Sequence, residues 1–157
     1  MRKSIIITIL IGAVLVLSGC AGQDSSEASG DNLATQVTDI RQINEALLDK
    51  PVLLKIGAEW CRPCLDQGAI INALAGEYEG RAAVMYIDTD ESPELSTFFS
   101  VYSIPDSCVI VGVENEQYIY MARDGTTSTR REYARFIGLT DKQTLANTLD
   151  HAIELNK

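Results

Sequence analysis

The sequence predicts an α/β fold, in which a central mixed sheet of four to five strands is flanked by helices and carries an extended C-terminal β-hairpin. Apolar, β-branched runs alternate with segments whose apolar residues recur every three or four positions, as strands and helices require. From residue 108 onward, strand-like runs follow one another with short turn signals between them. The first pattern indicates strands joined through helices, and the second indicates an antiparallel meander.

The first half of the domain has clear start signals for its elements. Asp39 and Gln42 can form a capping box. Residues 52–58 are apolar almost throughout, as expected for a central strand covered on both faces. Ser92 and Pro93 supply a cap and a first-turn proline. We therefore expect a helix over residues 39–48, a strand over 52–58, a helix over 61–78, a strand over 82–87 and a helix from residue 92.

The second half contains the meander and a closing helix. Asp124–Gly125 is a hairpin turn signal. Residues 133–137 are expected to form a strand, although Thr129 and Glu132 also fit a capping box that would start a short helix. Thr140 is expected to open the last helix. The predicted strands before these elements cover residues 108–113 and 118–122.

Residues 1–19 have the pattern of an export signal, because Arg2 and Lys3 precede an apolar stretch over residues 5–17. This stretch is shorter than the ~20 apolar residues that span a bilayer. Residues 17–20 (Leu-Ser-Gly-Cys) resemble the lipobox of bacterial-type lipoproteins, which implies cleavage before Cys20 and a lipid on its thiol. The alternative is an ordinary signal peptide or an uncleaved anchor.

Residues 20–32 are small, polar and acidic, so they are expected to form a flexible tether to a single folded domain over residues 33–157. Loss of Arg2 and Lys3, the only charges before Cys20, changes the net charge from −9 to −11. So acidic a chain is not expected to bind nucleic acid or to dock electrostatically on anionic lipid. The expected location is extracytoplasmic, with a covalent lipid anchor in a membrane, most simply the cell membrane.

A pair of cysteines lies where the strand over residues 52–58 gives way to a helix. Cys61 and Cys64 are separated by two residues, a spacing that lets a small disulfide close and reopen. The N-terminus of a helix stabilises a thiolate on the first cysteine and makes it a nucleophile. The pattern therefore indicates thiol–disulfide exchange.

The segment Glu-Trp-Cys-Arg-Pro-Cys over residues 59–64 is similar to the signature of the thioredoxin family. The spacing from Cys64 through Pro93 to Pro105 runs without a gap against the family pattern, and residues 136–145 resemble its closing strand, glycine and last helix. The resemblance covers about residues 38–155 and implies a thioredoxin fold.

The resemblance also implies roles for the residues around the pair. Cys61, expected to be exposed at the helix start, attacks a substrate disulfide, and Cys64, one turn further and more buried, resolves the mixed disulfide. Pro63 holds the first turn. The Ile104–Pro105 peptide bond is expected to be cis and to present backbone to an extended substrate segment. Trp60 is expected to shield the pair, or simply to pack in the core.

The chain departs from the family at three positions. Lys55 stands where thioredoxins usually carry a buried acid, Tyr86 stands at the position of the partner lysine, and Asp106 replaces the threonine after the proline. We expect Lys55 and Asp106 to pair beneath Cys64, with Lys55 favouring its thiolate. The alternative is that Lys55 extends to the surface.

Arg62 adds a permanent cation beside Cys61, where thioredoxin has glycine. A nearby positive charge lowers a thiol pKa and stabilises the reduced form. We expect a couple more oxidising than the roughly −270 mV of thioredoxin and less oxidising than the roughly −120 mV of the strongest oxidant in the family.

Together these features predict a membrane-tethered, extracytoplasmic thiol–disulfide oxidoreductase. Its partners are expected to be protein thiols and disulfides and an upstream electron donor, and it is expected to be a monomer without cofactor or metal. One alternative is a reductant dedicated to cytochrome c maturation. Another is a non-enzymatic thioredoxin scaffold that binds a partner or a soft metal.

Three further features have simpler explanations. Cys108 lies among apolar residues and is expected in the core. His151, the only histidine, is expected to be solvated. The stretch from Gly112 to Arg135 is longer than the usual hairpin of the family, and is either an elongated hairpin with polar decoration or a partner-recognition surface. Its candidate recognition residues are Arg130, Arg131, Arg135, Tyr118, Tyr120 and Tyr133.

Overall fold

A computed structural model describes residues 34–156. The expected signal, Cys20 and the tether lie outside the described residues. No helix within residues 34–156 has both the length and the apolar character needed to cross a membrane.

Helices and strands alternate along the chain as expected, and the long elements are confirmed within one or two residues at their ends. In chain order they are β1 (Thr35–Gln36), α1 (Ile40–Ala46), β2 (Val52–Gly57), α2 (Arg62–Glu77), β3 (Ala83–Asp88), α3 (Pro93–Phe98), β4 (Asp106–Glu114), β5 (Gln117–Met121), β6 (Thr127–Ser128), the 3-10 helix η1 (Arg131–Tyr133), β7 (Arg135–Ile137) and α4 (Lys142–Leu155).

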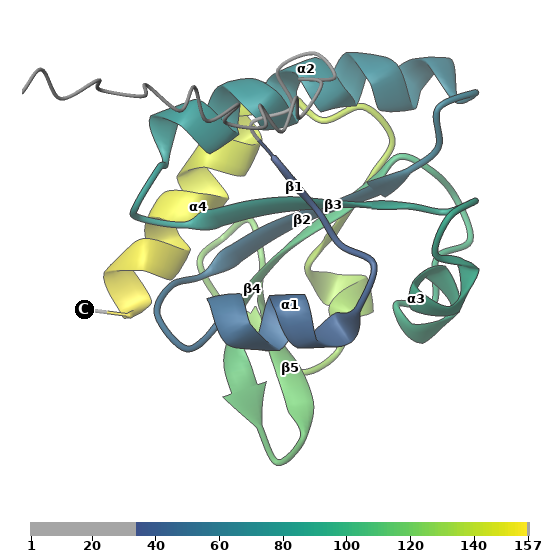
Figure 1. Ribbon diagram of the computed structural model, residues 1–157. Helices are drawn as coiled ribbons and strands as arrows, with labels where there is room; N and C mark the ends of the chain where they lie inside the picture. The colour runs from purple at the N-terminus through teal and green to yellow at the C-terminus, as the bar shows by residue number, and fades with distance from the viewer. Residues whose placement is uncertain (1–33, 157) are drawn as a thin grey trace, which may run out of the picture.

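The described strands form one mixed sheet in the order β1-β3-β2-β4-β5-β6, with β7 paired to β4 (Figure 1). The pairs β1–β3 and β2–β3 are parallel, whereas β4 runs antiparallel to β2, β5 and β7. The sheet has seven strands instead of four to five. The additional strands β1 and β6 have only two residues each, too few to show a sequence period.

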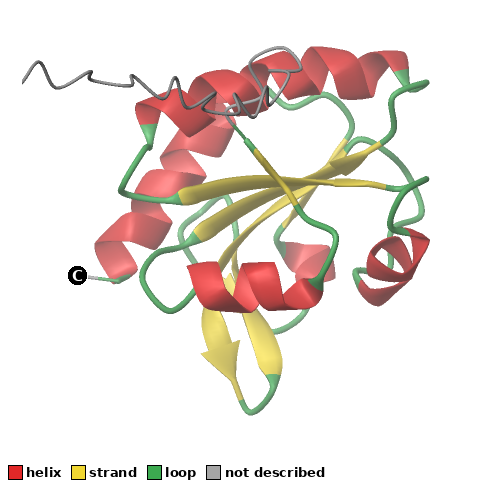
Figure 2. Ribbon diagram, viewed as in Figure 1, coloured by secondary structure: helices red, strands yellow, loops and turns green. Residues whose placement is uncertain are grey.

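Helices cover both faces of the sheet, with α2 and α4 on one side and α1 and α3 on the other (Figure 2). Successive residues of β2 point to opposite faces, so Leu53 joins the core beneath α2 and α4 while Leu54 joins the core beneath α1 and α3. Both leucines are fully buried. This two-sided burial explains why the predicted central strand is apolar almost throughout.

Polar side chains cap α1 and α4, whereas Ser92, the predicted cap of α3, occupies the N-cap position without a side-chain hydrogen bond. Asp39 and Gln42 form the predicted capping box of α1. The start of α4 is one residue later than expected, because Asp141 caps it by accepting from the Thr144 N–H at 2.9 Å. The Thr140 N–H is used elsewhere and donates to Oε1 of the buried Gln67 at 2.7 Å.

The predicted hairpin is formed by β4 and β5, which extend below the rest of the sheet in Figure 1. Its turn places Asn115 and Glu116 at φ of 50° and 63°, the left-handed values that a two-residue hairpin turn needs. Asp124–Gly125 forms the next turn, between β5 and β6. Residues 131–137 follow each interpretation only in part, since β7 begins two residues later than expected and η1 is a 3-10 helix of three residues. The Thr129–Glu132 capping box does not start it, because Arg130 is the N-cap of η1 and makes no side-chain capping hydrogen bond.

Candidate active site

The two cysteines lie at the junction of β2 and α2. Cys61 is the N-cap of α2, and its Sγ accepts a hydrogen bond from the Cys64 N–H at 3.3 Å. Pro63 lies in the first turn, where a missing backbone N–H costs nothing because that group has no partner within the helix. The first turn therefore directs its backbone N–H groups and the positive end of the helix dipole toward the sulfur of Cys61.

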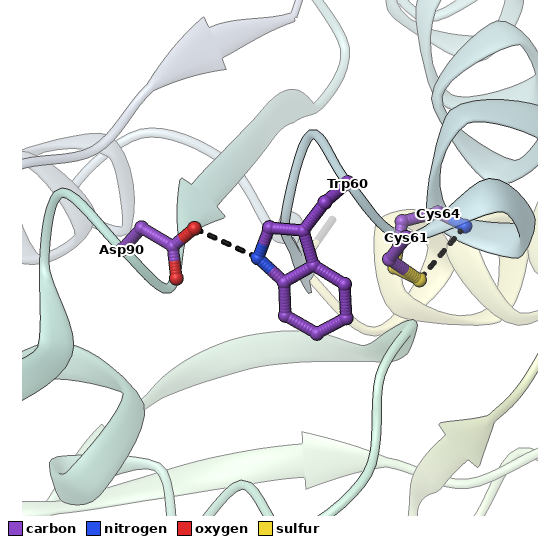
Figure 3. Close-up of a disulfide and its surroundings, with 4 residues drawn as sticks. All are labelled: Trp60, Cys61, Cys64 and Asp90. Atoms are coloured by element: carbon purple, nitrogen blue, oxygen red, sulfur yellow. Dashed lines mark hydrogen bonds between the residues drawn. A yellow bond between two sulfur atoms is a disulfide. The ribbon is translucent and has the colours of Figure 1, made fainter.

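Cys61 and Cys64 form a disulfide, with 5.1 Å between their Cα atoms (Figure 3). Cys61 was expected to be exposed, but only 6% of it is accessible, compared with 1% of Cys64. Ala58 and Ile104 pack against the two cysteines and cover them. Cys64 is more buried than Cys61, as expected, but the expectation that Cys61 is exposed is wrong.

Trp60 stands beside the disulfide at the surface. Its indole Nε1–H donates to the Asp90 carboxylate at 2.8 Å, which holds the ring between the β3–α3 loop and the disulfide (Figure 3). Because 72% of Trp60 is exposed, packing in the core is excluded as its role. A large apolar ring held at the surface next to a reactive bond is suited to contact with another molecule.

The Ile104–Pro105 peptide bond is cis, as the sequence resemblance implied. Ile104 packs against the disulfide cysteines, and the Pro105 carbonyl accepts a hydrogen bond from the Gly138 N–H at 2.8 Å. The segment before β4 is thus held against the sulfurs on one side and tied to the end of β7 on the other.

Lys55 lies beneath Cys64, as proposed from the sequence. A Cβ atom placed on Gly57 would lie 3.0 Å from Cys64 Sγ and 3.0 Å from Lys55 Nζ, so these two atoms are at most 6.0 Å apart. Glycine at position 57 leaves the space that both side chains use. Burial lowers the pKa of Lys55, and the negative charge of Asp88 partly opposes that shift.

A pocket of about 400 Å³ opens next to Cys64 and Lys55. Its walls include apolar residues of α2 and polar groups from β3, among them Tyr86, whose ring centroid lies 5.9 Å from Lys55 Nζ. The remaining lining residues are Ala34, Gln36, Ala58, Glu59, Leu65, Gly68, Ala69, Ile71, Asn72, Asp88 and Glu91. The pocket gives water a route from bulk solvent to Lys55 and Cys64.

The expected pairing of Lys55 with Asp106 is wrong. In the register of β2 and β4, Lys55 lies opposite Ser107, and Asp106 lies opposite Ile56. Neighbouring positions along a strand face opposite sides of the sheet, so the two side chains cannot meet. Asp106 is instead fully buried and forms ion pairs with Arg131 and Arg135.

Arg62 is at the surface beside the pair. Its side chain is 84% exposed and lies 3.6 Å from the Asp66 carboxylate one turn along α2. The cation is therefore present next to Cys61 as expected, and a neighbouring anion and solvent both reduce its field.

The family model for Thioredoxin matches residues 34–150. The chain belongs to the thioredoxin family. It is 35% identical to thioredoxin of Chlorobaculum thiosulfatiphilum over 86 residues, which is 55% of this chain and 72% of that one. It is 34% identical to thioredoxin 1 of a Nostoc species over 95 residues, covering 60% and 89%. Among solved structures, the germline-specific thioredoxin Deadhead of Drosophila melanogaster superimposes with a TM-score of 0.53 at 26% identity, covering 74% and 94%.

Membership of the thioredoxin family and the Cys61–Cys64 disulfide together identify a thiol–disulfide oxidoreductase. Proteins of this family act on protein disulfides. The family match and the similar solved structure confirm the thioredoxin fold that the sequence predicted, and the family match confirms the class of chemistry.

Cys108 and His151 lie away from the Cys61–Cys64 pair. Cys108 is fully buried, and this burial raises the pKa of its thiol against the opposing effect of Arg131. It is the core residue that the sequence predicted. His151 is exposed on α4. Within residues 34–156, no three His, Cys, Asp or Glu side chains are grouped as a metal ion requires.

Three site contacts were missed from the sequence. The hydrogen bond from the Trp60 indole to Asp90 was not predicted. Gly57 was interpreted only as part of a strand, and its lack of a side chain is what brings Lys55 near Cys64. Arg131 was assigned to a possible outer surface and is buried. A glycine inside an apolar strand was the one available signal, since it often marks a close approach of other groups.

Proposed function

We propose that this chain is a membrane-tethered, extracytoplasmic thiol–disulfide oxidoreductase that exchanges disulfides with protein substrates through Cys61 and Cys64. The observation that carries the chemistry is the closed Cys61–Cys64 bond at the N-terminus of α2. The support for tethering is the sequence of residues 1–20, with its basic start, apolar stretch and lipobox-like end. The monomeric state and the upstream donor are further parts of the proposal.

The reduced form begins the reaction with the thiolate of Cys61. This thiolate attacks one sulfur of a substrate disulfide, a mixed disulfide forms, and the other substrate sulfur leaves as a thiolate that takes up a proton. Cys64 then loses its proton and attacks the Cys61 sulfur, which closes the Cys61–Cys64 bond and releases the second substrate thiol. The substrate gains two electrons, and a dithiol donor restores them to the protein.

The neighbouring residues are assigned supporting roles. Ile104–Pro105 presents backbone to an extended substrate segment next to the sulfurs, and the exposed ring of Trp60 contacts the same substrate. Lys55 favours the thiolate of Cys64 during the resolving step, because its ammonium group lies within 6.0 Å of that sulfur.

Reduction of insulin by dithiothreitol tests the chemistry. Cys61→Ser is expected to lower the catalysed rate about a hundredfold or more, because no mixed disulfide can form at the first step. Cys108→Ala is the matched control, since it removes a thiol that lies in the core, and it is expected to retain the parent rate. A rate for Cys61→Ser equal to that of the parent would refute the proposal, and a parent rate no higher than that of dithiothreitol alone would favour the non-enzymatic scaffold.

The lipid anchor is tested in cells of a bacterium that processes lipoproteins. The parent chain is expected in the membrane fraction, with a mass increased by a diacylglyceryl group and a first residue at position 20. Cys20→Ser is expected to lose both the lipid and the membrane association, whereas Ser26→Ala in the same segment retains them. A parent chain that is exported without lipid would contradict the anchor and leave the thiol chemistry in place.

A further inference from the structure

Two arginines from the end of the long hairpin region surround one buried carboxylate. Arg131 Nη2 donates to Asp106 Oδ1 at 2.8 Å and Arg131 Nη1 donates to Asp106 Oδ2 at 3.1 Å, which is a two-pronged contact. Arg135 also donates to Asp106 Oδ2. The side chains of Arg131 and Arg135 are 9% and 7% exposed, and that of Asp106 is fully buried.

The same two arginines contact both ends of the segment between α3 and β4. Arg131 Nη1 also donates to the Phe99 carbonyl at 2.9 Å. The guanidinium of Arg135 lies 4.3 Å from the ring centroid of Tyr102. Residues 99–106 are therefore held at their start, their middle and their end by side chains from η1 and β7.

This segment contains the residue that packs against the disulfide cysteines. Ile104 packs against Cys61 and Cys64, and Asp106 follows two residues later. We propose that Arg131 and Arg135 are positioning residues, which hold Ile104–Pro105 against the disulfide through their ion pairs with Asp106. The proposal rests on the proposed function, in that this backbone is where a protein substrate is received.

Four of the six candidate recognition residues have this inward role or are buried, and only Arg130 and Tyr133 are exposed. Tyr118 and Tyr120, which the sequence placed on a possible partner surface, are buried. Arg130 differs from its neighbour Arg131, since its side chain is 61% exposed and pairs with Glu132. The stretch from Gly112 to Arg135 thus supplies both arginines, Arg131 from η1 and Arg135 from the first position of β7.

The charges of the cluster determine which variant to test. Two guanidinium groups face one carboxylate, so removal of one arginine leaves a neutral ion pair, whereas removal of Asp106 leaves two buried cations with no counter-charge. Arg135→Gln is therefore the informative change, and Arg130→Gln is its matched surface control.

The test compares a protein substrate with a small one. For Arg135→Gln we expect KM for insulin to rise by roughly three- to tenfold, because the receiving backbone is displaced. The rate with the small disulfide 5,5′-dithiobis(2-nitrobenzoate) and the equilibrium constant with glutathione are expected to stay within twofold of the parent. Arg130→Gln is expected to change none of these quantities.

An equal loss with insulin and with the small disulfide would show general damage to the site and overturn the proposal, and so would identical behaviour of Arg135→Gln and Arg130→Gln. Should Arg135→Gln not fold, Arg135→Lys carries the same test, since it retains the charge and loses the flat group over Tyr102.

Amide hydrogen exchange separates this inference from the proposed function, because it needs no activity. Arg135→Gln is expected to speed exchange of the Gly138 N–H, which donates to the Pro105 carbonyl, by about tenfold or more, with no change in Arg130→Gln. Unchanged exchange would refute the inference. A parent chain unable to reduce insulin would refute the proposed function alone.

Discussion

Lys55 changes the sign of the charge beneath the resolving sulfur. Thioredoxins usually place an acid there, whereas this chain places an ammonium group within 6.0 Å of Cys64 Sγ. A carboxylate opposes a neighbouring thiolate, and a cation favours it. Because burial lowers the pKa of Lys55, the amine is also closer to losing its own proton than a surface lysine is.

Replacement of this lysine should therefore affect the second step of exchange. Lys55→Met is expected to move the acid limb of the pH profile for resolving a mixed disulfide upward by about one pH unit, because the Cys64 thiolate loses a neighbouring cation. Single-turnover release of substrate thiol, measured between pH 5 and 9, checks this shift.

Lys50→Met is the control, because Lys50 precedes the opposite end of β2 and lies far from the sulfurs. It is expected to leave the pH profile unchanged. Coincident profiles for Lys55→Met and the parent would mean that the charge at position 55 does not act on Cys64.

Single residues were predictable where their function depends on local sequence. Cys61, Cys64 and Pro63 lie within four positions, so the strand end and the helix start were enough to place them. The partner of Asp106 was not predictable, because the register of two strands decided it. Lys55 and Asp106 do lie on neighbouring strands, yet they face opposite sides, while Arg131 approaches from 25 residues further along the chain.

At the scale of elements, α2 both carries the sulfurs and forms much of one core. Leu74 on its inner side is fully buried, whereas Leu65, nearer the disulfide, is 53% exposed. Replacement of a fully buried leucine removes apolar contacts and leaves a cavity.

Leu74→Ala is expected to lower the free energy of unfolding by about 2 to 5 kcal/mol. Leu65→Ala makes the same chemical change in the same helix and is expected to cost about 0.5 kcal/mol or less. Urea unfolding of both variants, with the disulfide kept oxidised, measures the difference. Similar losses in the two variants would contradict the assignment of the buried face.

Long elements were recognised from sequence because their period repeats several times. The strands β1 and β6 have two residues each and form through partners elsewhere in the sheet, so no local pattern reports them. The start of α4 was misplaced by one residue because Thr140 and Asp141 are both capping types. The Asp141 carboxylate accepts the Thr144 N–H, whereas the Thr140 hydroxyl donates to the Gly138 carbonyl.

At the scale of the whole molecule, buried tyrosines couple stability to alkaline pH. Burial raises the pKa of Tyr78 to about 12, helped by a hydrogen bond to Asp150, and burial raises the pKa of Tyr118 to about 12. The unfolded value is near 10.0. Between these values the unfolded chain binds fewer protons than the folded one, so stability is intact below pH 10 and falls as the pH rises toward 12.

We expect the urea concentration at the unfolding midpoint to decrease as the pH is raised from 9 to 11.5. Each of these tyrosines is expected to contribute on the order of 1 kcal/mol to the loss of unfolding free energy, because the hydroxyl groups are only partly buried. Tyr118→Phe is expected to reduce the fall, and Tyr133→Phe, which changes an exposed ring, is expected to leave it as in the parent. A fall of the same size in all three chains would exclude the buried tyrosines as its cause.

The turn at Asn115 and Glu116 is exposed at the tip of the β4–β5 hairpin, at the opposite end of β4 from Asp106. Exposed tips of this kind tolerate added chain. A fluorescent label or a short affinity peptide inserted at this turn would therefore mark the protein while it binds its protein substrates. The disulfide chemistry and both layers of helices would stay undisturbed.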